Sequence, residues 1–361
     1  MTEHADQQFM ARALELAARG LYTTTPNPRV GCVIVRDGAV VGEGWHARAG
    51  EPHAEVIALK AAGARARGAT VYVSLEPCHH HGRTPPCDAA LIAAGVARVV
   101  AALQDPDPRT AGQGLAQLRA AGIKTDCGLC ADEARELNIG FFSRATRGRP
   151  WVRMKIAASL DGRTALNNGA SRWITGAAAR RDGHHWRARA CAVLTGIGTV
   201  KDDDPQLNVR EVGTTRQPLR VVVDSRLEIA PVAKILDGGG ALIVCAGDDI
   251  AKSMALRARG AEILALPNAA GKVELPALLQ ELARRGINEL HVEAGHKLNG
   301  SLIREGCVDE LLIYFAPCLL GDRALGMAAL PELTALEARQ KLVFNETRMI
   351  GDDLRILARV V

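Results

Sequence analysis

The sequence predicts an α/β protein with two domains, and three observations support this prediction. The chain has 361 residues, more than one hydrophobic core usually organises. Segments typical of buried strands alternate with segments of helical periodicity, which is characteristic of layered α/β domains. A basic stretch containing Gly and Pro, at 146–150, separates two such regions. We therefore predict one domain at residues 1–147 and a second at residues 148–361.

The first domain is predicted to begin with a helix. Apolar residues recur at helical spacing across 7–19, and Gly20 is placed to end this helix. Asp37-Gly38 is typical of a hairpin turn that leads from a buried strand into Val40-Val41. The remaining elements are predicted as strands at 30–35, 69–75 and 96–101, and helices at 54–62 and 87–94.

The alternation of strands and helices begins again after Pro150. No internal repeat and no low-complexity tract interrupts it. Strands are predicted at 151–158, 191–195, 219–223, 241–245 and 289–293, and helices at 177–190, 273–285 and 298–305. The second domain is therefore also predicted to be an α/β domain.

The composition is that of an ordinary globular protein. Hydrophobic residues make up 48% and charged residues 24%, while aromatic residues are only 3%, which argues against a base-stacking surface. The net charge of +5 is mild and no run of Lys and Arg occurs, so phosphorylated small molecules suit the charge as well as nucleic acid does. Nine scattered cysteines, a polar acidic start and no membrane-length apolar stretch predict a cytoplasmic protein.

Two segments of the first domain predict a zinc site. His53-Ala54-Glu55 is followed by Cys78 and Cys87, each in a segment that leads into a predicted helix or out of a predicted strand. One imidazole and two thiolates can hold zinc and leave a fourth position open for water. Glu55 is expected to take the proton of that water and pass it on. The predicted reaction class is hydrolytic deamination of a ring carbon that bears an amino group.

The loop between the two cysteines leaves alternatives open. Eight residues separate Cys78 from Cys87, whereas the common deaminase signature has two. The loop is basic and stiffened by Pro85-Pro86, and Arg83 is suited to a substrate phosphate, unless this is a plain surface loop. A histidine among 79–81 could complete a structural zinc site with four protein ligands.

Two loops of the second domain suit a phosphorylated cofactor. Both follow predicted strands: 195–199 contains two glycines, and 293–297 precedes a helix. Backbone N–H groups at a helix start favour phosphate, and Gly295 and Lys297 lie there. Taken singly, each loop could also be a plain tight turn.

Four motifs of the first domain resemble one enzyme family. They are YTTTPNPRVG at 22–31, GEGWH at 42–46, HAE at 53–55 and EPCHHHGRTPPC at 76–87. Together they resemble the deaminase half of the bifunctional deaminase-reductases of riboflavin biosynthesis, the RibD family, and the resemblance covers nearly the whole chain. It implies a cytidine-deaminase-like three-layer domain with Zn²⁺ on His53, Cys78 and Cys87. It also implies that Asn27 hydrogen-bonds the pyrimidine and that His46 helps to form the pocket; alternatively, Asn27 is only a turn residue between two prolines.

Three further motifs resemble the reductase half of the same family. They are KIAASLDG at 155–162, SRWIT at 171–175 and DDPQLNVR at 203–210. This resemblance implies a dihydrofolate-reductase-like domain that uses NADPH. The cofactor residues it implies are Ala157, Trp173, Thr199, Asp203 and Ser225, and the substrate residues are Ser171, Arg187, Leu207, Arg210 and Glu293.

The chemistry of these side chains suits a sugar-phosphate substrate. Arg187 and Arg210 could clamp a phosphate, because a guanidinium binds phosphate through two parallel hydrogen bonds. Lys155 and Asp203 are expected to polarise or protonate the ribose as hydride arrives at its C1. Where the family usually has a glycine-rich loop after Glu293, this chain has Ala294 and His296-Lys297.

The resemblance implies two consecutive reactions. The first is deamination of 2,5-diamino-6-ribosylamino-4(3H)-pyrimidinone 5′-phosphate, and the second is reduction of the ribosyl side chain by NADPH to give 5-amino-6-ribitylamino-uracil 5′-phosphate. A homodimer joined through the second domain is expected as well. The alternatives are a nucleoside or nucleic-acid deaminase, which should carry stacking aromatics and a basic groove, and a structural zinc module, which should have a fourth protein ligand.

Overall fold

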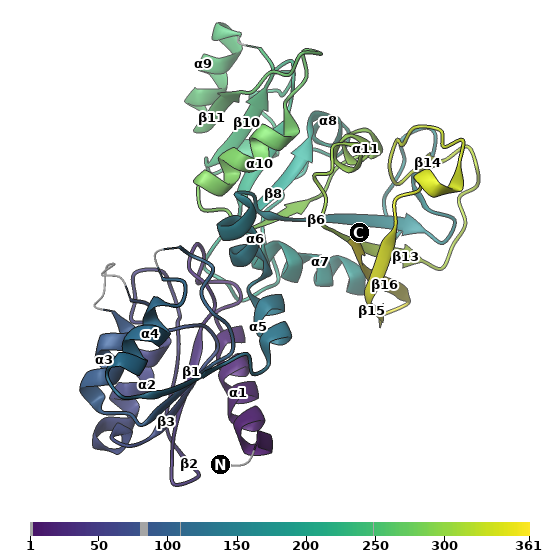
Figure 1. Ribbon diagram of the computed structural model, residues 1–361. Coiled ribbons are helices and arrows are strands. Elements are labelled where there is room, and N and C mark those ends of the chain that lie inside the picture. The colour runs from purple at the N-terminus through teal and green to yellow at the C-terminus, as the bar shows by residue number, and fades with distance from the viewer. Residues whose placement is uncertain (1–2, 80–85, 109, 248) are drawn as a thin grey trace. The chain divides into compact units, whose positions relative to one another are not determined.

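The computed structural model describes residues 3–79, 86–108, 110–247 and 249–361. The chain divides into two compact units, Met1–Gly148 and Arg149–Val361, which are shown in Figure 1. No helix of the described residues has the length and apolar character needed to cross a membrane.

A five-stranded sheet forms the centre of the first unit. The strand order is β2-β1-β3-β4-β5, with β1 antiparallel to β2 and β3, and with β3, β4 and β5 parallel. The strands are β1 Gly31–Arg36, β2 Ala39–Trp45, β3 Thr70–Val73, β4 Arg98–Ala101 and β5 Lys124–Cys127. The predicted hairpin turn is confirmed, because Asp37 and Gly38 both have the positive φ angles (51° and 79°) of a tight hairpin.

Helices cover both faces of this sheet. Side chains of β1 alternate between two cores: Cys32 and Ile34 pack under one helix layer, and Val33 and Val35 pack under the other. The first layer is α2 Ala54–Ala62, α3 Cys87–Ala94 and α4 Gln113–Ala120, with the short η1 Gly63–Ala66; the second is α1 Glu3–Ala18, α5 Ala131–Leu137 and α6 Ile139–Arg147. The unit is therefore a three-layer α/β/α sandwich.

Two glycines of β2 set the position of α2. A Cβ atom at Gly42 would lie 2.3 Å from the carbonyl oxygen of Ala58, and one at Gly44 would lie 2.3 Å from that of Ala54. Only glycine lets the helix backbone approach the strand this closely. The contact matters for the site described below, because α2 begins directly after His53.

The second unit is built on a nine-stranded mixed sheet in the order β11-β10-β9-β8-β12-β6-β13-β16-β15. Its strands from β11 to β13 are parallel, and β16 and β15 add an antiparallel edge. The strands are β6 Trp151–Ser159, β8 Ala192–Gly196, β9 Leu219–Val223, β10 Ala241–Cys245, β11 Ala261–Ala265, β12 Glu289–Val292, β13 Glu310–Ala316, β15 Leu342–Ile350 and β16 Asp353–Val360. A separate pair joins β7 Arg163–Ala165 to β14 Leu325–Gly326.

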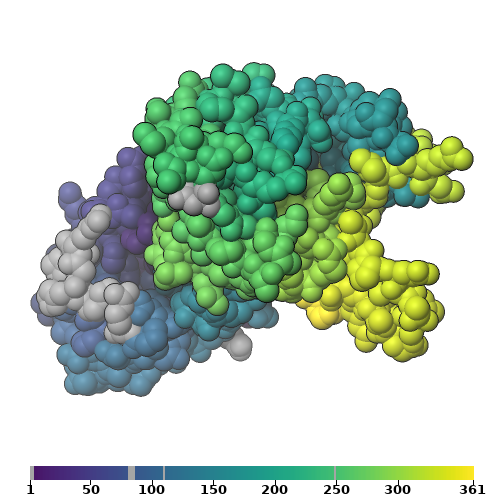
Figure 2. Space-filling view, turned by 90° about the horizontal axis from the view of Figure 1, so that it is seen from above, coloured from purple at the N-terminus to yellow at the C-terminus, as the bar shows by residue number. Residues whose placement is uncertain are grey.

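Helices again cover both faces. One face packs against α10 Leu275–Arg284 and α11 His296–Arg304, and the other against α7 Ala177–Arg189, α8 Ile197–Asp203 and α9 Ile250–Ala258. Two short turns of 3₁₀ helix, η2 Lys234–Leu236 and η3 Leu336–Ala338, lie in loops. The C-terminal segments, yellow in Figure 2, lie at the surface, and the side chains of β15 are mostly exposed.

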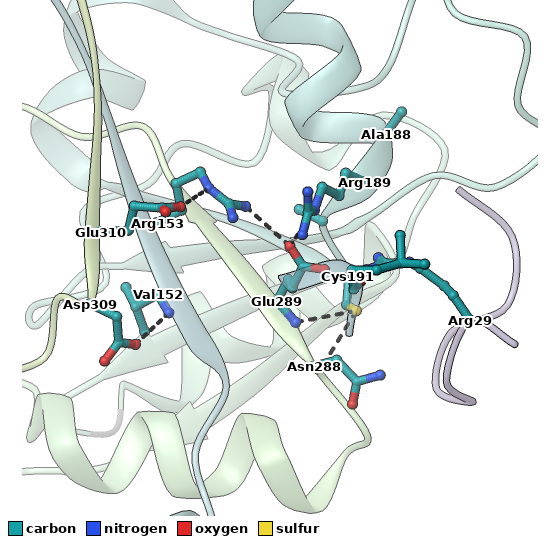
Figure 3. A network of polar contacts seen from close by, with 12 residues as sticks. Arg29, Val152, Arg153, Ala188, Arg189, Cys191, Asn288, Glu289, Asp309 and Glu310 are labelled. Carbon is teal, nitrogen blue, oxygen red and sulfur yellow. Dashed lines mark hydrogen bonds and ion pairs between the residues drawn. The ribbon is translucent and has the colours of Figure 1, made fainter. Parts of the chain in front are cut away.

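A buried ionic network lies beneath α7. Figure 3 shows Arg153 of β6 between the carboxylates of Glu310 and Glu289, at 2.5 and 3.1 Å, with Arg189 of α7 at 2.7 Å from Glu289. The guanidinium of Arg153 also lies 4.5 Å from the ring centre of Trp186. Buried charges need such complete pairing, so this network fixes α7 to three strands of the sheet.

Every strand and helix predicted from the sequence is present, within a few residues of its predicted bounds. Further elements were not predicted, among them α4 to α6, α8, α9, β5, β11, β13, β15 and β16. The exposed strand β15 carries no strong alternation of apolar and polar residues, so its periodicity gave no signal.

Candidate functional site

The three predicted zinc ligands lie together in the first unit. His53 caps the N-terminus of α2, Cys87 is the first residue of α3, and Cys78 lies in the loop after β3. The Nδ1 atom of His53 is 3.3 Å from Sγ of Cys87 and 3.6 Å from Sγ of Cys78. Among the described His, Cys, Asp and Glu side chains, these three are close enough to share a metal ion, and their ligand atoms all lie within 4.8 Å of one another.

The geometry of the three ligands fits zinc. Tetrahedral zinc with ordinary Zn–S and Zn–N bonds places a nitrogen and a sulfur ligand about 3.5 Å apart, close to both distances here. Three protein ligands leave one position open, which is typical of catalytic rather than structural zinc. Hydrogen bonds from Cys87 and His53 lower the pKa of Cys78, whereas the hydrogen bond to Cys78 and burial raise the pKa of Cys87. In this pair one thiol therefore donates to the other, and binding of a metal ion would deprotonate both.

The histidines of the cysteine loop supply no fourth ligand among the described residues. The ring of His79 lies outside the ligand group, and its Nδ1 is 2.6 Å from Oδ2 of Asp88. His80, His81 and the predicted phosphate-binding residue Arg83 fall outside the residues that the structure describes.

Glu55 lies beside the ligands, in the first turn of α2, and its side chain is buried. Burial, reinforced by the neighbouring Cys78, raises the pKa of Glu55 to about 7. A carboxyl group of this kind can both accept and release a proton near neutral pH.

Asn27 and His46 form a hydrogen-bonded chain next to the ligands. Nδ1 of His46 is 3.1 Å from the carbonyl oxygen of Pro52, which can only accept, so Nδ1 carries the hydrogen. Burial lowers the pKa of His46, which favours the neutral ring, and its Nε2 then accepts from the side-chain amide of Asn27 at 3.0 Å. The ring of His46 packs edge-on against His53. This arrangement leaves the amide oxygen of Asn27 available to a ligand.

The sequence analysis missed an acidic segment after β4. The buried carboxylate of Glu76 accepts backbone N–H groups of Asp105, Gly112 and Leu115, at 3.1, 2.9 and 3.0 Å. These three contacts hold Asp105, Gly112 and Leu115 against the residues that lead to Cys78. Burial raises the pKa of Asp105 to about 6, and nearby negative charges add to the effect. The sequence signal was available: Asp105-Pro106-Asp107-Pro108 follows the carboxyl end of a predicted strand.

The second unit contains a cavity of about 1270 Å³ at the carboxyl ends of its parallel strands. Ligands of open α/β sheets bind at this edge. The predicted residues that line the cavity are Lys155, Ala157, Ser171, Trp173, Arg187, Thr199, Asp203, Leu207, Arg210, Glu293, Gly295 and Lys297. Ser225 lines a smaller adjoining pocket that shares Arg226 with the cavity.

A charged group occupies the cavity wall where β6 and β12 lie side by side. Arg187 forms a two-point ion pair with Glu293, and its Nη1 donates to the carbonyl oxygen of Asn208 at 3.1 Å. Although burial raises the pKa of Glu293, the guanidinium outweighs it and holds that pKa well below its usual range. Burial lowers the pKa of Lys155. Three of the five N–H donors of Arg187 are therefore engaged by the protein, and its part in a phosphate clamp stays a prediction.

The cavity lining also includes an aromatic ring and a second carboxylate. The Trp173 side chain is 70% exposed, and Arg180 lies 4.6 Å from its ring centre. Asp203 ends α8, and its carboxylate is 3.0 Å from Nη2 of Arg172. An exposed ring beside a polar cavity suits stacking against a planar cofactor group.

Family models match both units. Residues 3–103 match the cytidine and deoxycytidylate deaminase zinc-binding region, and residues 150–356 match the RibD C-terminal domain. The riboflavin biosynthesis protein RibD of Escherichia coli (strain K12) is 48% identical, over 97% of this chain and 98% of its own. That of Haemophilus influenzae is 46% identical, over 99% and 98%. The chain belongs to the RibD family.

Solved structures agree with this membership. Form 1 of RibD from Acinetobacter baumannii has a TM-score of 0.92 at 43% identity and covers 99% of both chains. A deaminase/reductase from Thermotoga maritima has a TM-score of 0.87 at 31% identity, again over 99% of both. The predicted fold class is confirmed. The protein is a bifunctional deaminase and reductase of riboflavin biosynthesis, and Zn²⁺ and NADPH are its cofactors.

Proposed function

We propose that residues 1–147 form the deaminase domain and residues 148–361 the reductase domain. The substrate is a phosphorylated diaminopyrimidine, as in the T. maritima protein, a diaminohydroxyphosphoribosylaminopyrimidine deaminase/5-amino-6-(5-phosphoribosylamino)uracil reductase. The observation that carries the proposal is the three-ligand group with the buried Glu55 beside it. Among the described residues, neither a fourth zinc ligand nor any other feature favours the rival functions, a structural zinc module and a nucleic-acid deaminase.

In the first unit, different residues bind the metal ion, orient the substrate and transfer protons. Zinc, when bound by His53, Cys78 and Cys87, supplies a water activated for attack at neutral pH. Asn27 orients the pyrimidine through its free amide oxygen, and His46 holds Asn27. The carboxylate of Glu55 takes one proton of the water and delivers it to the ring nitrogen; it then takes the proton of the newly added hydroxyl group and delivers it to the amino group, which leaves as ammonia.

The residues of the second unit are proposed to hold cofactor and sugar phosphate. NADPH supplies the hydride. Arg187 fixes the carboxylate of Glu293 so that it accepts a hydrogen bond from a sugar hydroxyl, while Lys155 and Asp203 polarise the ribose. Arg210 is exposed and suits the phosphate, with Ser171 and Leu207 beside it. The cofactor residues are Ala157, Trp173, Thr199, Asp203, Ser225, Gly295 and Lys297.

A two-stage assay tests this proposal. Ammonia release from the diaminopyrimidine ribosyl phosphate is measured without NADPH, and NADPH is then added while its absorbance is followed. We expect zinc-dependent ammonia release and then NADPH consumption. Ammonia release without NADPH oxidation would refute the reductase assignment, and no release from zinc-loaded protein would refute the deaminase assignment.

We also propose that a second copy of the chain covers β15. This strand is the last of the sheet, and it exposes apolar side chains, with Phe344 at 68%. Unpaired apolar edges are usually covered, and two copies related by a twofold axis can cover each other. Analytical ultracentrifugation should show a dimer that Phe344→Asp dissociates and that Val232→Asp, at another exposed apolar position, leaves intact. A monomeric parent protein would refute this assembly.

The nine cysteines, all free, support the expected cytoplasmic location.

A further inference from the structure

A contact between two side chains ties the ends of the long cysteine loop. His79 directly follows the ligand Cys78, and Asp88 directly follows the ligand Cys87. Nδ1 of His79 lies 2.6 Å from Oδ2 of Asp88. The Asp88 side chain is only 2% exposed and that of His79 is 39% exposed. A buried carboxylate needs a donor, and an Nδ1–H group supplies one whether or not the ring is charged.

Two further contacts join the same ends. The backbone N–H of Asp88 donates to the carbonyl oxygen of Cys78 at 3.3 Å, and the backbone N–H of Cys87 donates to Sγ of Cys78 at 3.4 Å. Asp88 also accepts from the backbone N–H of Ala89 at 2.6 Å, in the first turn of α3. One carboxylate thus joins the start of the helix that carries Cys87 to the residue after Cys78.

We propose that His79 and Asp88 form a clasp that holds the two thiolates at zinc-binding separation. The inference rests on the proposed zinc site and goes beyond it, because it assigns positioning roles to two residues that are not ligands. Eight residues separate the cysteines, so without the clasp the loop would have to be ordered when zinc binds. Partners that orient metal ligands typically change metal affinity by about 10–100-fold.

The clasp explains why His79 is no fourth ligand. A ring whose Nδ1 faces Asp88 lies outside the ligand group. The two roles predict different results for His79→Asn. The side-chain amide nitrogen of Asn occupies nearly the place of Nδ1 and can donate to Asp88, but it is a poor replacement for a zinc-ligating imidazole.

The test is the zinc dissociation constant of the full chain, measured by competition with a chromophoric chelator. His79→Ala is expected to weaken zinc binding about 10–100-fold, and His79→Asn should restore most of the affinity. Asp88→Asn should also weaken binding, because its amide nitrogen would face the Nδ1–H donor while its oxygen still accepts from Ala89. His4→Ala, on the exposed start of α1, serves as the matched control and should change nothing.

Two further measurements separate the possible results. Circular dichroism of the metal-free variants checks folding, and if His79→Ala fails to fold, the Asp88→Asn and His79→Asn pair still tests the clasp. The absorption spectrum of the Co²⁺-substituted protein should be the same in parent and variants, since the ligand set is unchanged. Parent-like zinc affinity in His79→Ala and Asp88→Asn would overturn the clasp alone. An altered Co²⁺ spectrum in His79→Asn would make His79 a ligand, and a parent that binds no zinc would overturn the proposed deaminase site itself.

Discussion

Single side chains carry the proposed chemistry, and their surroundings decide what each can do. Burial and the neighbouring Cys78 raise the pKa of the Glu55 carboxyl group to about 7. Glu293 is a carboxyl group held ionised by Arg187, although it too is buried. The same functional group therefore suits proton transfer in one unit and fixed hydrogen bonding in the other, because only Glu293 has a cation paired with it.

Replacing Glu55 with Gln should abolish proton transfer while leaving the zinc ligands in place. We expect zinc content to stay at the parent level and ammonia release to fall about 10²–10⁴-fold, the usual contribution of a general base. Zinc content by atomic absorption and ammonia release by a coupled assay measure the two effects. An unchanged rate would rule out the proton-transfer role.

Arg187→Lys tests whether reduction requires the two-point contact with Glu293 or only a positive charge beside it. Lysine keeps the positive charge but cannot make the two-point contact with Glu293. Hydrogen bonds to charged groups contribute about 1.5–3 kcal/mol, so NADPH oxidation should slow about 10–100-fold. Ammonia release by the same sample is the internal control. Parent-like NADPH oxidation would show that Glu293 does not depend on Arg187.

At the scale of elements, close packing of strand and helix positions the zinc site. His53 precedes α2, and α2 lies against β2 only because Gly42 and Gly44 carry no side chain. Cys87 begins α3, and Glu76, two residues before Cys78, is hydrogen-bonded to Gly112 and Leu115. Each ligand is thus placed by an element that the core holds firmly.

Gly44→Ala tests this dependence. Its Cβ would lie 2.3 Å from the carbonyl oxygen of Ala54, so α2 must shift. Overpacking of this kind costs about 1–3 kcal/mol, and we expect a lower melting temperature together with weaker zinc binding. The control is Gly213→Ala, since a Cβ at Gly213 meets no atom within 4 Å. Stability and zinc affinity equal to the parent would contradict the role given to this contact.

At the scale of the whole molecule, the chain consists of two units with separate cores and separate candidate sites. The zinc ligands all belong to the first unit, and the described residues that line the large cavity all belong to the second. The product of the first proposed reaction is the substrate of the second, so the two activities can be measured separately on one protein.

Metal removal should therefore act on one activity alone. After treatment with a chelator, ammonia release is expected to be lost, while NADPH oxidation with the deaminated substrate continues at the parent rate. Readdition of Zn²⁺ should restore ammonia release. If the chelator also stops reduction of the deaminated substrate, the two units do not function separately.

The sequence by itself determined the family and the alternation of strands and helices, and it predicted the group of His53, Cys78 and Cys87, which the structure brings together beside Glu55. These features are local, because residue type, short spacing and the period of apolar residues encode them. It also indicated twelve of the residues that line the cavity, most of them through motifs that resemble the reductase half of the family.

Only the tertiary structure decided how these residues are used. Arg187 and Glu293 are 106 positions apart, and Glu76 and Gly112 are 36 apart, so their contacts depend on which strands and helices become neighbours. The same holds for His79 and Asp88, whose pairing depends on where the core places Cys78 and the start of α3. A hydrogen bond between distant residues follows from packing of the whole core, and no local pattern of the sequence encodes it.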